Sequence, residues 1–166
     1  FFYKMAVHKL DFEDFDEINY QLVAIHTSLE DYRLAYFINQ KLPINLISNK
    51  NEIHINIKEG ETNFSRFYYY DKEKEISWNL IQNKNEVIQQ KKENNQNLFS
   101  NLNMEVSTKV FLLPEFKKVD YFLKIENTEE VMDIKEIQLL LNTIENISTA
   151  YSVDTHKIKS KNNLIF

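Results

Sequence analysis

The chain has 166 residues, of which 43% are hydrophobic and 13% aromatic, and its formal net charge is −5. This length suits one domain with its own core, and the aromatic content argues against disorder over the whole chain. A net acidic chain disfavours a general binder of the nucleic-acid backbone, which needs a concentrated basic surface. We therefore do not expect nucleic acid as a direct ligand.

Several residue types that carry chemistry are missing. The chain has no cysteine, which excludes disulfides, thiolate zinc sites, iron–sulfur clusters and cysteine nucleophiles and fits a cytoplasmic location. Its single glycine, Gly60, excludes a Walker A loop, a GxGxxG turn and a GxSxG nucleophile elbow, since each needs at least two. No apolar run approaches the ~20 residues of a membrane span. We expect no cofactor, no enzymatic activity and no membrane association.

The first half of the chain predicts a strand followed by a helix. Residues 20–26 form an apolar run of strand length, and Thr27 with Glu30 three residues later has the spacing of a capping box. From residue 29 the apolar positions fall on one helical face, and Pro43 ends the helix because it disfavours α geometry in the residue before it.

Three further runs predict an antiparallel meander. Residues 53–57 alternate isoleucine with polar residues, which is typical of a half-buried strand. Residues 65–70 and 75–83 flank a polar turn and predict a hairpin. The next stretch, at about 83–103, is dominated by Asn, Gln, Lys and Glu, so we expect a polar loop or a partly disordered insertion there.

The second half repeats the order of strand, helix and strand. Residues 109–115 and 117–127 predict two strands joined as a hairpin. Asp133 can cap a helix with Glu136 three residues later, and residues 148–154 return as a strand. Two apolar patterns support this: Val119, Tyr121, Leu123 and Ile125 alternate, and Ile134, Ile137, Leu141 and Ile144 form a helical stripe.

These elements predict an α+β protein. Two strand–helix–strand units around a meander imply a two-layer sandwich, with a largely antiparallel sheet and two main helices on one face. A ferredoxin-like or ACT-like plan is the nearest analogy. Met5 followed by Ala6 is typical of a natural start, so we expect one domain over residues 5–166. Residues 1–4 are then an upstream extension or a cloning remnant.

Metal binding has little support in the sequence. The four histidines, His8, His26, His54 and His156, lack the close spacing of a metal pair. Residues 11–17, DFEDFDE, carry five carboxylates but lack the glycine of an EF-hand loop. This acidic run is interpreted as a solvated face. The functional alternative is a contact for a basic partner, anchored by Phe12 and Phe15.

The strand SRFYYY offers an aromatic surface. Tyr68 and Tyr70 share one face and Phe67 and Tyr69 the other, so one pair is expected to be exposed. Together with Trp78 such rings could stack on nucleic-acid bases, but the acidic chain favours a protein-contact surface.

The only two arginines, Arg33 and Arg66, suggest bidentate carboxylate partners, with Glu115 or Asp120 as candidates. A structural ion pair is favoured over a catalytic one.

The segment LPEFKKVDY carries the most specific signal. It resembles the signature of the IPExxxVDY family, small proteins of Bacteroidetes without an assigned activity. Pro114, Glu115, Asp120 and Tyr121 match it in identity and spacing, as does Val119, while leucine replaces isoleucine at 113. Residues 31–42 also look like the first helix of that family, so the resemblance covers nearly the whole chain from Met5.

Physically, the motif is interpreted as a strand, a proline-shaped turn and a returning strand. Glu115 and Asp120 could converge as an acid–base pair, but no nucleophile or cofactor signal accompanies them.

We therefore expect a non-enzymatic cytoplasmic adaptor or regulatory subunit that binds an unknown protein through its aromatic sheet face or acidic N-terminal run, with self-association as a further option. The alternative is an ACT-like regulatory domain that binds a small ligand near residues 27–30 or Asp133.

Overall fold

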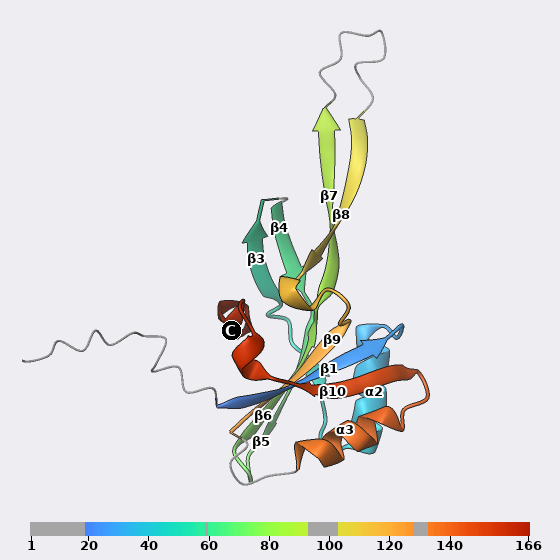
Figure 1. Ribbon diagram of the computed structural model, residues 1–166, viewed down its shortest axis with the longest axis vertical. Helices are drawn as coiled ribbons and strands as arrows, with labels where there is room; N and C mark the ends of the chain where they lie inside the picture. Colours follow the sequence, from blue (N-terminus) through green and yellow to red (C-terminus); the bar gives the residue numbers. More distant parts are fainter. Residues whose placement is uncertain (1–18, 59, 93–102, 128–132) are drawn as a thin grey trace, which may run out of the picture.

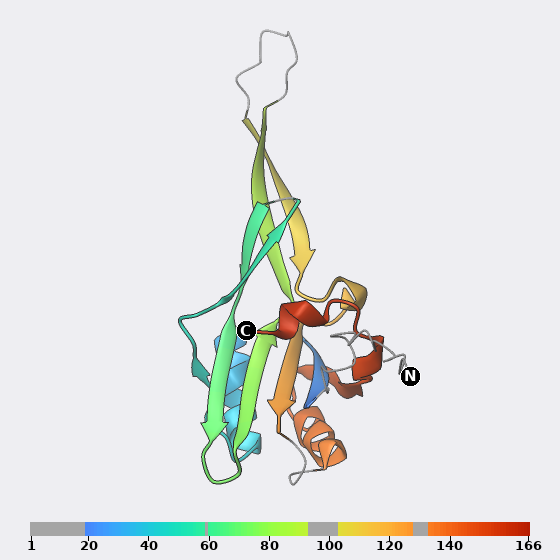
Figure 2. The same ribbon diagram turned by 90° about the vertical axis from the view of Figure 1, so that its left-hand side faces the viewer.

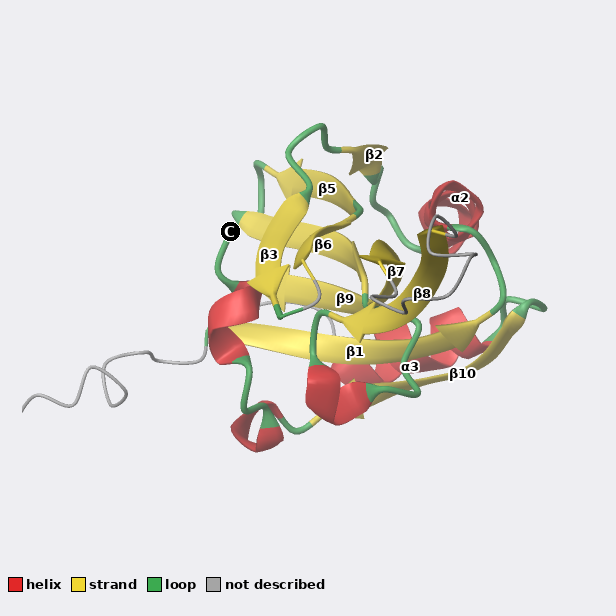
Figure 3. Cartoon of the chain, turned by 90° about the horizontal axis from the view of Figure 1, so that it is seen from above, coloured by secondary structure: helices red, strands yellow, loops and turns green. Residues whose placement is uncertain are grey.

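A six-stranded antiparallel sheet forms the centre of the protein (Figure 1). The computed structural model describes residues 19–58, 60–92, 103–127 and 133–166. The strand order is β10-β1-β9-β6-β5-β2, and this succession can be followed in Figure 3. The strands are β1 (Tyr20–Thr27), β2 (Ile47–Ser48), β5 (Arg66–Asp71), β6 (Ile76–Gln82), β9 (Tyr121–Glu126) and β10 (Ile147–Val153).

Two helices cover one face of this sheet: α2 (Asp31–Lys41) and α3 (Ile134–Asn142). The side chains that they bury meet those of the central strands in one cluster, which we name the helix-side core. Each large apolar side chain buried in this way stabilises the fold by about 1.5–3 kcal/mol. The cluster includes Val23, Ile25, Leu34, Ala35, Ile38, Trp78, Leu80, Tyr121, Leu123, Ile125, Ile137 and Leu141.

The opposite face of the sheet is also covered, so the expected two-layer sandwich is too simple. The cover consists of the two-stranded sheet of β3 (Ile53–Ile57) and β4 (Gly60–Phe64) together with three short 3₁₀-helices. These helices are η1 (Pro114–Phe116), η2 (Thr155–Lys157) and η3 (Lys161–Leu164). The second cluster, the far-side core, contains Leu22, Ala24, Ile53, Phe64, Ile81, Val110, Leu112, Leu113, Val119, Phe122, Ile158 and Leu164.

A long two-stranded ribbon projects from the sheet (Figures 1 and 2). It pairs β7 (Lys84–Lys92) with β8 (Asn103–Phe111) along their whole described length. The expected polar loop at 83–103 is therefore wrong for residues 84–92, while residues 93–102 lie outside the described part. The polar composition gave a wrong prediction because β7 is stabilised by contacts with segments that are distant in the sequence. Val87 packs against the far-side core, and β4 runs beside β7.

Most of the other predicted elements are confirmed, with local differences. The hairpin of residues 65–70 and 75–83 forms as β5 and β6. The strand at 53–57 pairs with β4 instead of extending a meander. Asp133 caps α3 by accepting a hydrogen bond from the Lys135 backbone N–H at 3.0 Å. The Thr27 cap is wrong, because Glu30 is the N-cap of α2 and Thr27 ends β1.

The α+β class is confirmed, with a large antiparallel sheet and two helices. The sheet is larger than expected, and two further two-stranded sheets accompany it among the described residues. None of the helices in the described ranges is long and apolar enough to cross a membrane.

Candidate functional site

The LPEFKKVDY segment does not form the expected hairpin. Strand β8 ends before it and β9 begins at its last residue, Tyr121, and these two strands do not pair with each other. Pro114 is the first residue of η1, where its missing N–H costs no hydrogen bond. Val119 packs in the far-side core, away from Tyr121, because it precedes the regular alternation of β9.

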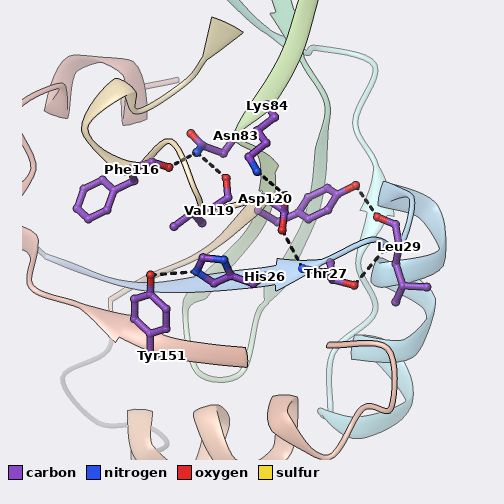
Figure 4. A network of polar contacts seen from close by, with 10 residues as sticks. His26, Thr27, Leu29, Asn83, Lys84, Phe116, Val119, Asp120 and Tyr151 are labelled. Carbon is purple, nitrogen blue, oxygen red and sulfur yellow. Dashed lines mark hydrogen bonds and ion pairs between the residues drawn. The ribbon is translucent and has the colours of Figure 1, made fainter. Parts of the chain in front are cut away.

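Asn83 holds this segment in place (Figure 4). Its side chain is fully buried between β6 and β7. The amide nitrogen donates to the backbone oxygens of Phe116 and Val119 at 2.9 and 2.8 Å, and the amide oxygen accepts from the Leu113 N–H at 2.9 Å. One side chain thus satisfies backbone groups at both ends of the turn. Asn83 was not predicted from the sequence, where its position directly after an apolar strand was the only available signal.

Asp120 joins three segments that are distant in the sequence. One carboxylate oxygen accepts from the Thr27 backbone N–H at 2.9 Å, and the other pairs with the Lys84 ammonium at 2.9 Å (Figure 4). Its own backbone N–H donates to the Ile25 carbonyl at 3.1 Å. The next residue, Tyr121, donates its hydroxyl to the Leu29 carbonyl at 2.9 Å. Burial, reinforced by nearby carboxylates, raises the pKa of Tyr121 to about 12.

Glu115 instead binds the C-terminal segment, which we define as residues 155–166. Its carboxylate accepts from the backbone N–H groups of Lys159 and Ser160 and from the Ser160 hydroxyl, each at 2.8 Å. Burial raises the pKa of Glu115, but these hydrogen bonds outweigh it and hold the pKa below its ordinary value. Glu115 and Asp120 therefore contact separate sets of partners. Nothing in these contacts pairs them as acid and base.

The two arginines do not bind the expected carboxylates. Arg33 is exposed on α2, and among the described residues neither Arg33 nor Arg66 takes part in an ion pair. The Arg66 guanidinium instead lies 4.8 Å from the centre of the Phe166 ring and 5.8 Å from that of Tyr68. These are cation–π distances.

An aromatic surface lies around Arg66 on the sheet face opposite the helices. The predicted division of β5 holds, because Phe67 and Tyr69 pack against the helix-side core and Tyr70 on the other face is 42% exposed. Figure 2 shows the C-terminal segment in front of the central sheet, with α2 behind the sheet. We name this surface the C-terminal aromatic patch and define it as Ile47, Arg66, Tyr68, Tyr70, Ile165 and Phe166.

A buried lysine fastens the C-terminal segment beside this patch. Lys124 donates to the Leu164 carbonyl at 2.8 Å and forms an ion pair with Glu126. Its ammonium lies 4.8 Å from the Phe166 ring centre and 5.0 Å from that of Tyr20. The role of Lys124 was not predicted from the sequence, because a lysine in an alternating strand is ordinarily exposed.

The other predicted site residues contribute little. Phe12 and Phe15 lie outside the described residues. Trp78 is buried in the helix-side core, so it cannot serve as a base-stacking platform. His26 is hydrogen-bonded to the Tyr151 hydroxyl at 3.0 Å and stacked on that ring. Among the described residues no group of three or more His, Cys, Asp or Glu side chains could hold a metal ion.

Comparisons with known proteins gave no match, whether to protein-family models, to curated proteins or to solved structures. The resemblance to the IPExxxVDY family therefore stays a prediction. The fold and the site define an α+β protein whose LPEFKKVDY segment is fixed by internal contacts. On its surface, the rings of Tyr68 and Phe166 lie against Arg66, which forms no ion pair with another described residue.

Proposed function

We propose that this protein is a non-enzymatic adaptor or regulatory subunit that binds another protein through the C-terminal aromatic patch. The observation that carries the proposal is Arg66, which lies among exposed apolar side chains and pairs with no carboxylate within the described ranges. A cytoplasmic location remains part of the proposal.

The composition of the patch supports protein binding. Ile47 is 60% exposed and Phe166 44%, although aliphatic and aromatic side chains of this size are more often buried. Ile47 is the cross-strand neighbour of Tyr68, so these two side chains share a face with Tyr70. Tyrosine and arginine are the residue types that most often anchor protein interfaces, because they combine apolar area with hydrogen-bonding groups.

The positive charge of Arg66 indicates which chemical groups the partner would present to the patch. Desolvation lowers the pKa of Arg66, and no other described residue accepts a hydrogen bond from its buried Nε atom. The acidic residue that acts on Arg66, Glu126, is already paired with Lys124. The fitting partner therefore presents a carboxylate beside an apolar side chain, which would give Arg66 the charged acceptor that it lacks.

Affinity purification from the native cells tests the proposal. We compare the wild-type protein with Ile47→Ser, Tyr70→Ser and Arg66→Gln. Tyr36→Ser is the matched control, because Tyr36 lies on α2 and is 59% exposed, against 60% for Ile47 and 42% for Tyr70. The expected result is one partner that the wild type and control retain and that each patch variant loses by at least ~10-fold. A partner retained equally by all variants, or a protein recovered only as an unaccompanied monomer, would overturn the proposal.

The ACT-like ligand-binding domain is the second candidate. Strands β9 and β10 are both antiparallel to β1, which lies between them, and α3 connects them. This split βαβ arrangement supports the ferredoxin-like analogy. Against a ligand near residues 27–30, Thr27 already donates its hydroxyl to the Asn146 carbonyl at 2.7 Å and receives the Leu29 N–H at 3.1 Å.

A further inference from the structure

A group of exposed lysines lies on the short helices that cover the sheet face opposite α2 and α3. Two of these lysines directly follow η1, and the other three belong to the C-terminal segment, within and between η2 and η3. We name this surface the lysine patch and define it as Lys117, Lys118, Lys157, Lys159 and Lys161. None of the five forms an ion pair with another described residue.

Glu115 brings the two parts of the lysine patch together. Its carboxylate accepts from the backbone N–H groups of Lys159 and Ser160 at 2.8 Å, so η1 lies directly beside the C-terminal segment. Lys117 is two residues from Glu115, which separates their Cα atoms by at most about 8 Å. The Glu115 carboxylate is already occupied by these N–H groups and by the Ser160 hydroxyl, and it forms no ion pair with a lysine of the patch.

Buried contacts hold the backbone under the lysine patch in one arrangement. Ile158 and Leu164 are buried in the far-side core, and Asn163 donates to the Leu112 carbonyl at 2.8 Å. The lysines are therefore displayed on a backbone that is already ordered. Such a surface loses less conformational entropy when a partner binds.

The lysine patch is a local concentration of positive charge in an acidic protein. The formal net charge of the whole chain is −5, so the positive charge of the patch is not a general property of the surface. Positive charge that is confined to one surface attracts an anionic partner and speeds its association.

The surroundings of the lysine patch favour a short anionic partner over a nucleic acid or an anionic membrane. Asp154 is exposed directly before η2, and Glu61 is exposed on the β3–β4 sheet, which packs on the same far-side core. A duplex or a bilayer is wider than the patch and would bring its phosphates toward these carboxylates, which repel them. A short acidic protein segment can stay on the lysines.

Apolar side chains at the end of the C-terminal segment also favour a protein segment. Ile165 is 71% exposed and Phe166 44%, and both follow Lys161 closely in the sequence. They offer a contact that an apolar side chain of a partner can use and that a phosphate group cannot.

We propose that the lysine patch binds a short acidic segment of the partner protein, whose carboxylates contact the lysines and whose apolar side chain packs on Ile165 and Phe166. This inference rests on the proposed function, because Ile165 and Phe166 belong to the C-terminal aromatic patch and the partner is the same. The interface would then continue from Arg66 along the C-terminal segment to η1.

Fluorescence anisotropy with the full chain and a labelled peptide tests the proposal. The probe is Glu-Glu-Asp-Phe-Glu-Glu with blocked termini, and Gln-Gln-Asn-Phe-Gln-Gln is the uncharged control. We expect saturable binding of the acidic peptide that weakens as the salt concentration rises, and no binding of the control. A short single-stranded DNA of equal charge and phosphatidylserine vesicles form two further arms. No binding of the acidic peptide, or tighter binding of the DNA or the vesicles, would overturn the proposal.

Charge-removing variants locate the binding. One double variant combines Lys117→Gln with Lys118→Gln, and the other combines Lys157→Gln with Lys159→Gln. We expect each to weaken binding of the acidic peptide by at least ~3-fold, since each lysine is exposed to solvent. Circular dichroism checks that each variant folds.

A third double variant, Lys72→Gln with Lys74→Gln, is the matched control. Both lysines are exposed in the turn between β5 and β6, outside the lysine patch, so we expect unchanged binding. Equal weakening by this control, or no weakening by the patch variants, would overturn the proposal.

The peptide assay uses purified components, so its result does not depend on recovery of a partner from cells. A native partner that Ile47→Ser loses but that the lysine variants bind as the wild type does would support the proposed function and overturn this inference. Peptide binding that the lysine variants weaken, with no native partner recovered, would overturn the proposed function and retain the lysine patch as a site for acidic segments.

Discussion

The carboxylate of Asp120 accepts a hydrogen bond from the backbone N–H of Thr27 at 2.9 Å, across 93 positions of sequence. This bond fixes the end of β1 against the residue that precedes β9. The second carboxylate oxygen reaches Lys84 at the start of β7. Asp120 therefore positions the projecting ribbon relative to the central sheet, and it does so with atoms that a catalytic carboxylate would need free.

The two bonds of Asp120 can be separated by mutation. Asp120→Ala removes both and leaves the part-buried Thr27 N–H without its acceptor, so we expect a loss of about 1–3 kcal/mol in the free energy of unfolding. Asp120→Asn keeps an acceptor but loses the ion pair with the partly exposed Lys84, which is worth about 0–1 kcal/mol. In urea unfolding, Asp120→Ala should have a clearly lower free energy of unfolding than Asp120→Asn, and Lys84→Met should have a value close to that of Asp120→Asn. Equal losses for all three would contradict this assignment.

Glu115 should make stability depend on pH in the acid range. Because its folded-state pKa is lowered, its contribution is fully present above the unfolded-state pKa of ~4.3 and is lost as pH falls through the lower folded-state pKa. We expect Glu115→Gln to cost about 1–2 kcal/mol near neutral pH, where hydrogen bonds to a carboxylate are lost. The difference in the free energy of unfolding between wild type and variant should become smaller below about pH 4.

Urea unfolding at a series of pH values measures this gap. Glu145→Gln is the control, because Glu145 is exposed in the loop after α3 and is not among the described residues that bond Lys159 or Ser160. A gap for Glu115→Gln that stays constant from neutral to acid pH would show that the carboxylate charge does not matter.

Tyr121 should act in the opposite pH range. Its pKa is raised to about 12, so its contribution is fully present below the unfolded-state pKa of ~10 and is lost as pH rises through the folded-state pKa. Tyr121→Phe leaves the Leu29 carbonyl without its donor, and we expect it to cost about 1–2 kcal/mol at neutral pH. Denaturant unfolding from neutral to alkaline pH should show the difference shrinking above about pH 10. Tyr36 is exposed, so Tyr36→Phe should have the same free energy of unfolding as the wild type throughout this pH range.

The Asn142 side chain covers the outer edge of β10 at Ala150. The Asn142 amide accepts from the Ala150 N–H at 2.8 Å and donates to the Ala150 carbonyl at 2.9 Å, as a neighbouring strand would. Asn142→Ala uncovers an edge strand whose sequence, ISTAYSV, contains no charge and no proline. We expect a loss of about 1–2 kcal/mol in stability and concentration-dependent association.

Light scattering coupled to size-exclusion chromatography measures this association. Gln138→Ala is the control, because within the described residues the Gln138 side chain makes only one long hydrogen bond to β10, from the Ser152 N–H at 3.4 Å. A strictly monomeric Asn142→Ala protein at high concentration would contradict the role of this amide in protecting the edge.

Local patterns in the sequence determined most of the individual elements. The alternation in residues 53–57, the polar turn between β5 and β6 and the Asp133 cap of α3 all predicted what forms, because each depends on neighbours within a few residues. The division of the tyrosines between the two faces of β5 was predictable for the same reason.

Tertiary structure decided what those patterns could not reach. Strand β7 exists because β8 and β4 lie beside it, and Lys124 is buried because the C-terminal segment folds over it. Likewise, Asp120 meets Thr27 and Glu115 meets Ser160 only after the sheet has brought distant segments together. Hydrogen bonds and burial across such separations leave no periodic signal in the sequence. The residues of the LPEFKKVDY segment could therefore be singled out in the sequence, but the contacts that these residues make became visible only in the folded chain.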